Sequence, residues 1–353
     1  MKRKKKKKIG VGRAIGSVFA VLGTSLGMVI IGLYAIMLVV THGPSTVARD
    51  YFVLSVRESS AGGFLANMCV SKSTIKEIEE NNKVADMDGV SDSSLITIDT
   101  DDDTDDDSTV FDTIEKENPD LVPYLVEDGI GFYDVSGSTY QGTMVVVEDP
   151  ARVFVGSSGD YTGEAGMSVP DICEKYGATL AINAGGFEDD GGVGDGGTPL
   201  GFVFSEGVYK FGSLTESYNL IGFDSNNVFV IGSMTGQEAI DRGIRDAVSF
   251  SPFLILDGSP LEVTGLGGGL NPRTAIGQRS DGAVLMLIIE GRQASSLGAS
   301  MNDLINEMLS FGAVNAANLD GGGSTVLYYK GEVKNTVASI YGTRGVPTAI
   351  CVR

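Results

Sequence analysis

The distribution of apolar and polar residues divides the chain into three parts. Residues 14–40 are a run of 27 residues without a charged side chain, rich in Val, Ile, Leu, Gly and Ala. From residue 41 to about 125, Ser, Thr, Asn and acidic residues dominate and continuous apolar patterns are scarce. Beyond residue 125, short apolar runs alternate with turns rich in Gly, Asp and Ser. The pattern predicts a hydrophobic segment, a polar connector and one large domain.

The third part has the pattern of an α+β domain. Its apolar runs have the length and composition of β-strands, and they are Thr143–Val147, Arg152–Val155, Leu180–Asn183, Gly201–Phe204, Asn227–Ile231, Phe253–Leu256, Val284–Ile289 and Val326–Tyr329. Three helices are predicted over Ser168–Tyr176, Gln237–Arg242 and Met301–Phe311, the last with Ser300 as N-cap and Gly312 as its stop. Strands outnumber helices without alternating strictly with them, which favours α+β and a single mixed-sheet domain over 126–353.

The apolar run over 14–40 is long enough to cross a bilayer with some tilt. It is longer than the apolar region of a secretory signal, so we expect an uncleaved signal anchor, with a cleaved signal peptide as the alternative. Residues 1–13 carry eight basic side chains, and no acidic residue precedes Asp50. This asymmetry predicts a single-pass cell-membrane protein with a cytoplasmic basic tip at 1–13 and an extracellular C-terminal domain.

The connector over 41–125 is predicted to be an extracytoplasmic acidic stalk, with one helix over Ser73–Asn81. The densest acidic run is Asp99–Asp107, and such blocks of like charge are usually solvated linkers. Calcium binding is the alternative, but an EF-hand loop counted from Asp99 needs Gly at its sixth position and Glu at its twelfth, where Thr104 and Val110 stand. We therefore expect no metal or other cofactor, with calcium as an unsupported possibility.

Charge, histidine and cysteine exclude several classes of function. Outside the basic tip, 18 basic residues face 46 acidic ones, a net charge of −28, which argues against nucleic-acid binding. The single histidine, His42, lies next to the apolar run, so acid–base chemistry in the domain has to use carboxylates, Tyr or Lys. The three cysteines are widely spaced and form no thiolate metal motif.

The strongest candidate for chemistry is the turn Asn318-Leu319-Asp320-Gly321-Gly322-Gly323-Ser324-Thr325. Its glycines permit positive φ and close approach of a ligand to the backbone. Successive N–H groups in such a turn can form an anion-binding nest. A plain Gly-rich turn before a strand is the alternative interpretation.

Other candidates for chemistry lie at the ends of apolar runs. Glu290 and Asp320 are a pair of carboxylates of the kind that divides acid and nucleophile or base roles in glycoside cleavage. Arg273 and Arg292 present planar forks suited to phosphate or carboxylate, with structural salt bridges as the alternative.

One internal similarity connects two polar turns. Tyr176-Gly177-Ala178 leads through an apolar run to Asn183 and two glycines, as Phe311-Gly312-Ala313 leads to Asn318 and the Asp320 turn. Two such strand ends could meet at one cleft, but chance similarity among many Gly-rich turns is the interpretation that the sequence favours.

Five stretches, in this order, resemble motifs of the phosphodiester glycosidase family. They are Asn183-Ala184-Gly185-Gly186-Phe187, Asn271-Pro272-Arg273-Thr274-Ala275-Ile276-Gly277, Glu290-Gly291-Arg292-Gln293, Asn318-Leu319-Asp320-Gly321-Gly322-Gly323-Ser324 and Arg344-Gly345-Val346-Pro347-Thr348-Ala349. The resemblance covers about 142–353. It departs from the family at Glu290, where Asp is more common.

The resemblance implies a hydrolase that cleaves a sugar-1-phosphodiester bond. The family includes an enzyme that removes N-acetylglucosamine from a sugar-phosphate diester, and bacterial exported proteins described as exopolysaccharide-related. For this chain it implies a cell-surface glycan or glycopolymer as substrate. A non-catalytic glycopolymer-binding or exopolysaccharide assembly protein is the alternative, and a metal-dependent phosphodiesterase with an all-oxygen site is a third possibility.

The motif positions imply roles for individual residues. Asp320 would be the nucleophile or base with Glu290 as its partner, Arg273 and Arg292 would hold the phosphate, and Asn183 would contact the sugar. The full set of predicted substrate-binding residues is Asn183, Gly185, Gly186, Arg273, Thr274, Arg292, Gly321, Gly322, Gly323, Ser324 and Arg344.

Overall fold

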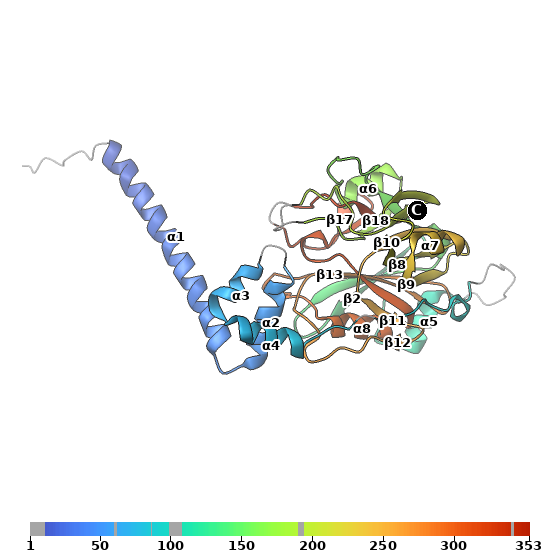
Figure 1. Ribbon diagram of the computed structural model, residues 1–353, viewed down its shortest axis with the longest axis horizontal. Coiled ribbons are helices and arrows are strands. Elements are labelled where there is room, and N and C mark those ends of the chain that lie inside the picture. The colour runs from blue at the N-terminus through green and yellow to red at the C-terminus, as the bar shows by residue number, and fades with distance from the viewer. Residues whose placement is uncertain (1–10, 60–61, 86, 99–107, 190–193, 340–341) are drawn as a thin grey trace, which may run out of the picture.

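The computed structural model describes residues 11–59, 62–85, 87–98, 108–189, 194–339 and 342–353. One long helix projects away from a compact body, and three shorter helices lie between this helix and the body (Figure 1). The acidic run over 99–107 lies outside the described residues, so the predictions made for it stay predictions.

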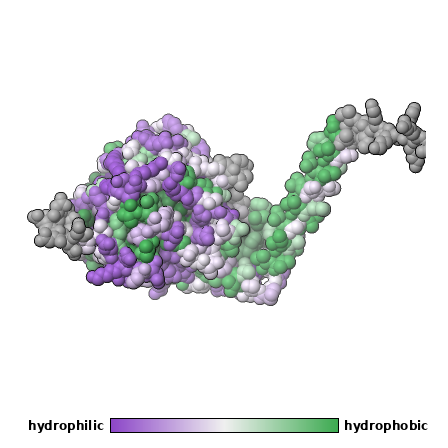
Figure 2. Space-filling view, turned by 180° about the vertical axis from the view of Figure 1, so that it is seen from behind, coloured by the Kyte–Doolittle hydropathy of each residue, from purple (hydrophilic) through white to green (hydrophobic). Residues whose placement is uncertain are grey.

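The projecting helix is α1, Val11–His42. The most apolar stretch within its segment Ile15–His42 has a mean hydropathy of 2.2, and none of this stretch is buried. Figure 2 shows apolar residues along this helix, in contrast to the largely polar face of the body. The predicted apolar helix is therefore present, and its length and composition are those of a membrane span.

The segment predicted to be a stalk contains folded helices. They are α2 Thr46–Arg57, α3 Gly63–Cys69 and α4 Lys72–Asn81, the last of which confirms the predicted helix. Together they bury a small core formed by Val53, Leu54, Ala66, Ile75 and Ile78. The segment predicted to be a stalk therefore has a small packed core of its own, because a few apolar residues on each short helix meet across three helices.

The chain after α4 runs along the body. Val84 forms a β-bridge with Val263, and Val90 forms one with Gly232. A 3-10 turn, η1 Ser93–Leu95, and the helix α5 Val110–Glu117 follow. Phe111 and Ile114 on α5 are buried in the core of the body. The core of the body therefore includes residues that precede 126.

The body contains three β-sheets, in which every strand pair among the described residues is antiparallel. The largest sheet has the order β1 Leu125–Glu127, β2 Ile130–Ser136, β3 Gln141–Val147, β14 Val284–Ile289, β13 Arg273–Arg279, β15 Ala313–Leu319, β11 Phe253–Leu256 and β12 Ser259–Pro260. The second has the order β7 Val208–Phe211, β6 Val203–Ser205, β10 Ile244–Ser249, β8 Ser217–Asp224 and β9 Phe229–Thr235. The third has the order β17 Glu332–Val333, β16 Leu327–Tyr329, β5 Leu180–Asn183, β18 Thr348–Val352 and β4 Val153–Ser157.

The predicted α+β class is confirmed, whereas the single mixed sheet is replaced by three antiparallel sheets. One hydrophobic core is shared by strands of all three sheets, including Val145, Ile182 and Ile231. A second core lies between the large sheet and the helices α5 and α8. Alternation along one strand does not specify its neighbours, so the number of sheets could not be read from the sequence.

The three predicted helices of the domain are present. They are α6 Val169–Lys175, α7 Gly236–Asp241 and α8 Met301–Ser310. At the start of α8, Ser300 and Asp303 form a capping box. Beyond the helix, Gly312 adopts a φ of +79°, which favours glycine. These local signals place β15 directly behind α8, and β15 carries the Asp320 turn at its end.

Candidate active site

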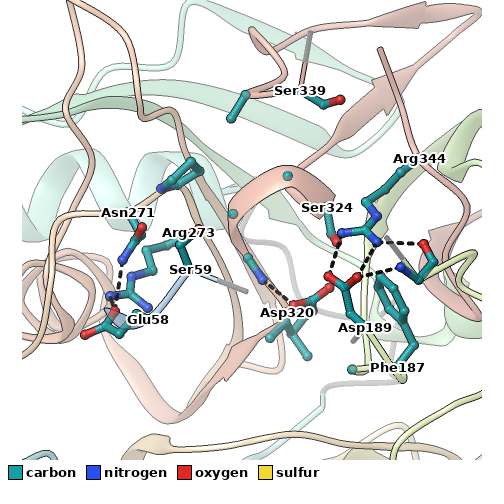
Figure 3. A pocket seen from close by; sticks show the side chains of 18 of the residues that line it. Glu58, Ser59, Phe187, Asp189, Asn271, Arg273, Asp320, Ser324, Ser339 and Arg344 are labelled. Atoms are coloured by element: carbon teal, nitrogen blue, oxygen red, sulfur yellow. Dashed lines mark hydrogen bonds and ion pairs between the residues drawn. The ribbon is translucent and has the colours of Figure 1, made fainter. Parts of the chain in front are cut away.

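A cavity of about 520 Å³ lies at the end of β15. Its wall combines the start of β13, the turn after β15, the loop after β5, the loop before β18 and the end of α2. Figure 3 shows Asp320 between two groups of charged side chains, one around Glu58 and Arg273 and the other around Asp189 and Arg344. Segments that are far apart in the sequence therefore build one site.

The ends of β5 and β15 meet at this cavity. The Asp320 N–H donates to the carbonyl oxygen of Ala184 at 3.0 Å, and the Asn183 side-chain amide donates to the carbonyl oxygen of Asp320. The similarity between the two helix–strand–turn segments thus corresponds to a shared location, and chance alone was the wrong interpretation.

Asn183 holds the backbone at the base of the cavity. It is fully buried, and its Oδ1 accepts from Thr274 Oγ1 at 2.8 Å and from Val326 N at 3.2 Å. Thr274 is fully buried as well. Neither side chain lines the cavity, so their predicted contact with substrate is not supported. They position the strand ends instead.

Asp320 is the carboxylate at the centre of the cavity. Its Oδ1 accepts from Gly321 N at 2.9 Å. Burial raises the pKa of Asp320 to about 6, while the Ser324 hydroxyl, the Gly321 N–H and Arg344 lower it and the Asp189 charge raises it. A carboxyl group with this pKa can exchange a proton near neutral pH, as general acid–base catalysis requires, and it is mainly ionised above pH 6, as a nucleophile requires.

Arg273 faces the cavity from β13 but is held in an ion pair. Its Nη2 lies 2.6 Å from Glu58 Oε2, and the same nitrogen donates to the carbonyl oxygen of Gly269 at 2.8 Å. Its Nε donates to the carbonyl oxygen of Ala299 at 3.2 Å. Arg273 was predicted to bind the phosphate of the substrate. In the structure its guanidinium instead forms an ion pair with Glu58 at the end of α2.

Arg344 forms the opposite wall with Asp189. Its two terminal nitrogens contact the two carboxylate oxygens of Asp189 at 2.9 and 3.0 Å, which is a bidentate pair. Its Nη2 also donates to the carbonyl oxygen of Gly194 at 2.8 Å, and the guanidinium lies 4.6 Å from the centre of the Phe187 ring. Arg344 therefore lines the cavity as predicted, with its charge already paired.

Arg292 is the cavity arginine without a carboxylate partner among the described residues. Its Nη2 donates to Asn271 Oδ1 at 3.2 Å. The same nitrogen lies 3.2 Å from the place that a Cβ would take on Gly322, so a side chain there would press on the guanidinium. Burial and the nearby Arg273 charge lower the pKa of Arg292, as expected for a cation that lacks a counter-ion.

Glu290 is not among the residues that line the cavity. Its Oε1 accepts from Thr336 N at 2.6 Å, and its Oε2 accepts from Gln293 Nε2 at 3.2 Å. The Glu290 carboxylate thus forms hydrogen bonds with the loop after β17 and with Gln293. The predicted catalytic pairing of Glu290 with Asp320 is therefore not supported, because the strand pattern indicated where Glu290 lies but not where its side chain turns.

Most backbone N–H groups of the Gly-rich turn form hydrogen bonds within the turn or with neighbouring segments. Gly321 N–H donates to Asp320, Gly322 N–H to the carbonyl oxygen of Pro272 at 2.9 Å, and Ser324 N–H to that of Gly321 at 3.1 Å. The predicted nest of Gly321, Gly322 and Gly323 is therefore largely satisfied internally. All three glycines and Ser324 nevertheless line the cavity, so their small size shapes it.

The remaining predicted residues are close to the site. Gly186 lines the cavity, whereas Gly185 is buried behind it and its N–H donates to Thr348 Oγ1 at 3.0 Å. The predicted site residues do not include Glu58, Asp189 or Asn271, although all three line the cavity. Asp189 and Asn271 lie in or next to the motifs and could have been chosen, but Glu58 carries no local signal.

The cavity is lined by six charged side chains, three of which are acidic and three basic. Glu58 is paired with Arg273, and Asp189 with Arg344. Asp320 and Arg292 remain. No group of three or more His, Cys, Asp or Glu side chains within the described part of the chain is arranged to hold a metal ion. The cavity thus presents one carboxylate of raised pKa and one uncompensated cation.

Comparison with known proteins places this site in a family. A profile of the phosphodiester glycosidase family matches residues 176–353. The chain is 29% identical over 201 residues to the SPbeta prophage-derived uncharacterized protein YomE of Bacillus subtilis, covering 54% of this chain and 29% of that protein. It is 27% identical over 216 residues to the N-acetylglucosamine-1-phosphodiester alpha-N-acetylglucosaminidase of Bos taurus, covering 54% of this chain and 40% of that enzyme.

A solved structure has a similar fold. The catalytic domain of the zebrafish N-acetylglucosamine-1-phosphodiester alpha-N-acetylglucosaminidase superposes with a TM-score of 0.54 at 19% identity, covering 64% of this chain and 82% of that one. The chain spans less than half the length of the two curated relatives. Since the family profile covers half of the sequence, including the cavity turn at Asp320, the chain belongs to the phosphodiester glycosidase family.

Proposed function

We propose that the protein is a membrane-anchored hydrolase that cleaves the bond between a sugar anomeric carbon and a phosphodiester. The observation that carries the proposal is that one cavity of the family domain is lined both by Asp320, with its raised pKa, and by Arg292, which has no carboxylate partner among the described residues. A phosphodiester brings one negative charge for Arg292 and an electrophilic carbon for Asp320.

The chemistry follows from this arrangement. Above pH 6 Asp320 is mainly ionised. It either attacks the anomeric carbon, forming a glycosyl ester that water then hydrolyses to free sugar, or removes a proton from a water that attacks this carbon directly. The carbon–oxygen bond breaks, and the oxygen leaves on phosphorus. Arg292 stabilises the charge on the departing phosphate. Phosphate is a good leaving group, so the reaction does not require a second carboxylate such as Glu290 as general acid.

The proposed location is the outer face of the cell membrane. The apolar segment Ile15–His42 of α1 has the length of a membrane span, and the basic residues within 1–13 precede this segment. The body would then meet sugar phosphodiesters of a cell-surface glycan or glycopolymer. Localisation of a C-terminal tag by protease protection in intact cells tests this topology.

Turnover of defined compounds tests the reaction. The full chain in detergent micelles is incubated with a panel of sugar-1-phosphodiesters that includes N-acetylglucosamine-1-phosphate esters, and free sugar is measured. The full chain is needed because Glu58 and Phe111 lie before residue 126. Release of sugar that Asp320→Asn abolishes supports the proposal. Binding of the esters without release by any variant would favour a non-catalytic glycopolymer-binding protein.

A further inference from the structure

The segment between the membrane helix and the body reaches into the cavity. Glu58 is the residue that caps the C-terminal end of α2, and both Glu58 and Ser59 line the cavity wall. Arg273 lies 215 residues further along the chain. The juxtamembrane helices are therefore part of the site and not only a tether.

The Glu58 carboxylate is fully engaged on the cavity wall. Its Oε1 accepts from Gly269 N at 2.6 Å, and its Oε2 accepts from Arg273 Nη2 at 2.6 Å and from Asn271 Nδ2 at 2.9 Å. Asn271 in turn accepts from Arg292 Nη2. One carboxylate thus neutralises Arg273 and orients the amide that contacts Arg292.

By pairing with Arg273, the Glu58 carboxylate lowers the net positive charge that the cavity presents to a ligand. Without Glu58, two neighbouring arginines, Arg273 and Arg292, would face a bound phosphate. With Glu58 in place, only Arg292 has no counter-ion among the described residues that line the cavity. The Asp320 carboxylate adds a further negative charge at neutral pH, which disfavours a ligand with two negative charges.

We propose that Glu58 is a specificity-determining residue that matches the cavity to the single negative charge of a phosphodiester and against the double charge of a phosphomonoester. This inference rests on the proposed function for its biological meaning. Cleavage of a phosphodiester releases a phosphomonoester, which carries close to two charges at pH 8. The same charge balance that admits the substrate therefore favours release of the product.

Two variants that break the same ion pair test the proposal. Glu58→Gln frees Arg273 and adds one positive charge to the cavity, whereas Arg273→Gln frees Glu58 and adds one negative charge. Affinities for methyl phosphate and dimethyl phosphate are measured at pH 8 by phosphorus NMR titration of the full chain. We expect E58Q to bind methyl phosphate about tenfold more tightly, with a smaller gain for dimethyl phosphate.

The opposite charge change should have the opposite effect. R273Q is expected to weaken methyl phosphate binding by about tenfold and dimethyl phosphate binding by less. The double variant E58Q/R273Q restores the charge balance and should return the ratio of the two affinities to the wild-type value. If E58Q gives no cooperative thermal melt, R273Q carries the test alone.

A matched control lies in the same helical segment. Arg57 and Glu79 form an ion pair at 2.8 Å outside the cavity, with side chains 42% and 39% exposed. Glu79→Gln breaks this pair and should leave both affinities unchanged. If E58Q and R273Q both weaken the two probes alike, Glu58 only holds the fold together and the proposal is wrong.

The outcome also separates this proposal from the proposed function. If the wild type binds neither probe, or binds methyl phosphate more tightly than dimethyl phosphate, the charge selection is refuted. If the probes and variants follow the predicted order while no sugar-1-phosphodiester is hydrolysed, the proposed reaction fails and the charge selection by Glu58 stands.

Discussion

Asp320 and Asp246 are two aspartates whose pKa is raised by desolvation, but their surroundings differ. Burial raises the pKa of each to about 6. Asp246 on β10 is completely buried, accepts from Val155 N at 3.1 Å and Glu206 N at 2.8 Å, and pairs with Arg245. Asp320 lines an open cavity.

The difference shows that a raised pKa does not by itself identify a catalytic group. The Asp246 carboxylate joins β10 to the neighbouring strand β4 and the turn after β6, and no substrate can reach it. Asp320 also has a raised pKa, but it lines a cavity that a ligand can enter and that also contains Arg292, an arginine without a counter-ion among the described residues. Access and the neighbouring charge assign the catalytic role.

Removal of the Asp320 carboxylate should have the largest effect. Asp320→Asn keeps the size of the side chain but removes its nucleophilic or basic oxygen, so kcat for a cleavable sugar-1-phosphodiester should fall by about 10²–10⁴-fold. Steady-state assays on the folded variant measure this. An Asp320→Asn protein with more than a tenth of wild-type kcat would remove Asp320 from the mechanism.

Asp246→Asn should affect stability instead of catalysis. It leaves Arg245 without its buried partner, at a cost of about 3 kcal/mol in the free energy of unfolding. Urea unfolding monitored by circular dichroism measures the loss, and kcat per folded molecule should stay within about twofold of the wild type. A large loss of kcat in the folded fraction would break the distinction between the two aspartates.

In the same unfolding experiment at pH 8, Asp320→Asn should raise the free energy of unfolding, whereas Asp246→Asn should lower it. The pKa of Asp320 is about 6 in the folded protein and 3.8 for an unperturbed aspartate, so between these two pH values the folded protein holds a proton that the unfolded chain has released. Stability therefore falls as pH rises through this window, and at pH 8 the ionised Asp320 costs about 1–3 kcal/mol. Asp320→Asn should recover part of this at pH 8 but little at pH 4.

Arg292 can be tested through the Michaelis constant. Arg292→Gln removes the cation without a counter-ion, and loss of one charge-assisted hydrogen bond should raise KM by about 10–100-fold. Gln293→Ala is a nearby control, because Gln293 does not line the cavity. An unchanged KM in Arg292→Gln would show that the phosphate binds elsewhere.

The pH dependence of kcat/KM is expected to show the smallest of these effects. Because Asp320 acts in its ionised form, kcat/KM should be level above its pKa of about 6 and fall about tenfold for each pH unit below it. A profile measured between pH 4.5 and 8.5 tests this. A rise in kcat/KM below pH 6 would assign Asp320 the role of an acid.

The sequence could predict features that depend on neighbouring residues. The α8 helix follows from its apolar period and capping box, β5 from its apolar run, and the Asp320 turn from its glycines. The meeting of β5 and β15 was visible as a similarity of pattern but not as a contact. Local signals therefore gave the elements and the centre of the site.

Features that depend on distant contacts were missed. Glu58 lies in a polar stretch that predicts a stalk, and its role arises only when α2 packs next to β13. Glu290 lies at a strand end as predicted, but its carboxylate binds a loop 46 residues further on. Side-chain direction and pairing across the fold decide such roles, and the local pattern does not contain them.

The central claim is cleavage at carbon by a glycosidase. Hydrolysis of a sugar-1-phosphodiester in water enriched in oxygen-18, followed by mass spectrometry of both products, distinguishes the bond that breaks. We predict the heavy oxygen in the released sugar and none in the phosphomonoester, because water ends at the anomeric carbon. The heavy oxygen in the phosphomonoester would show cleavage at phosphorus and contradict the account.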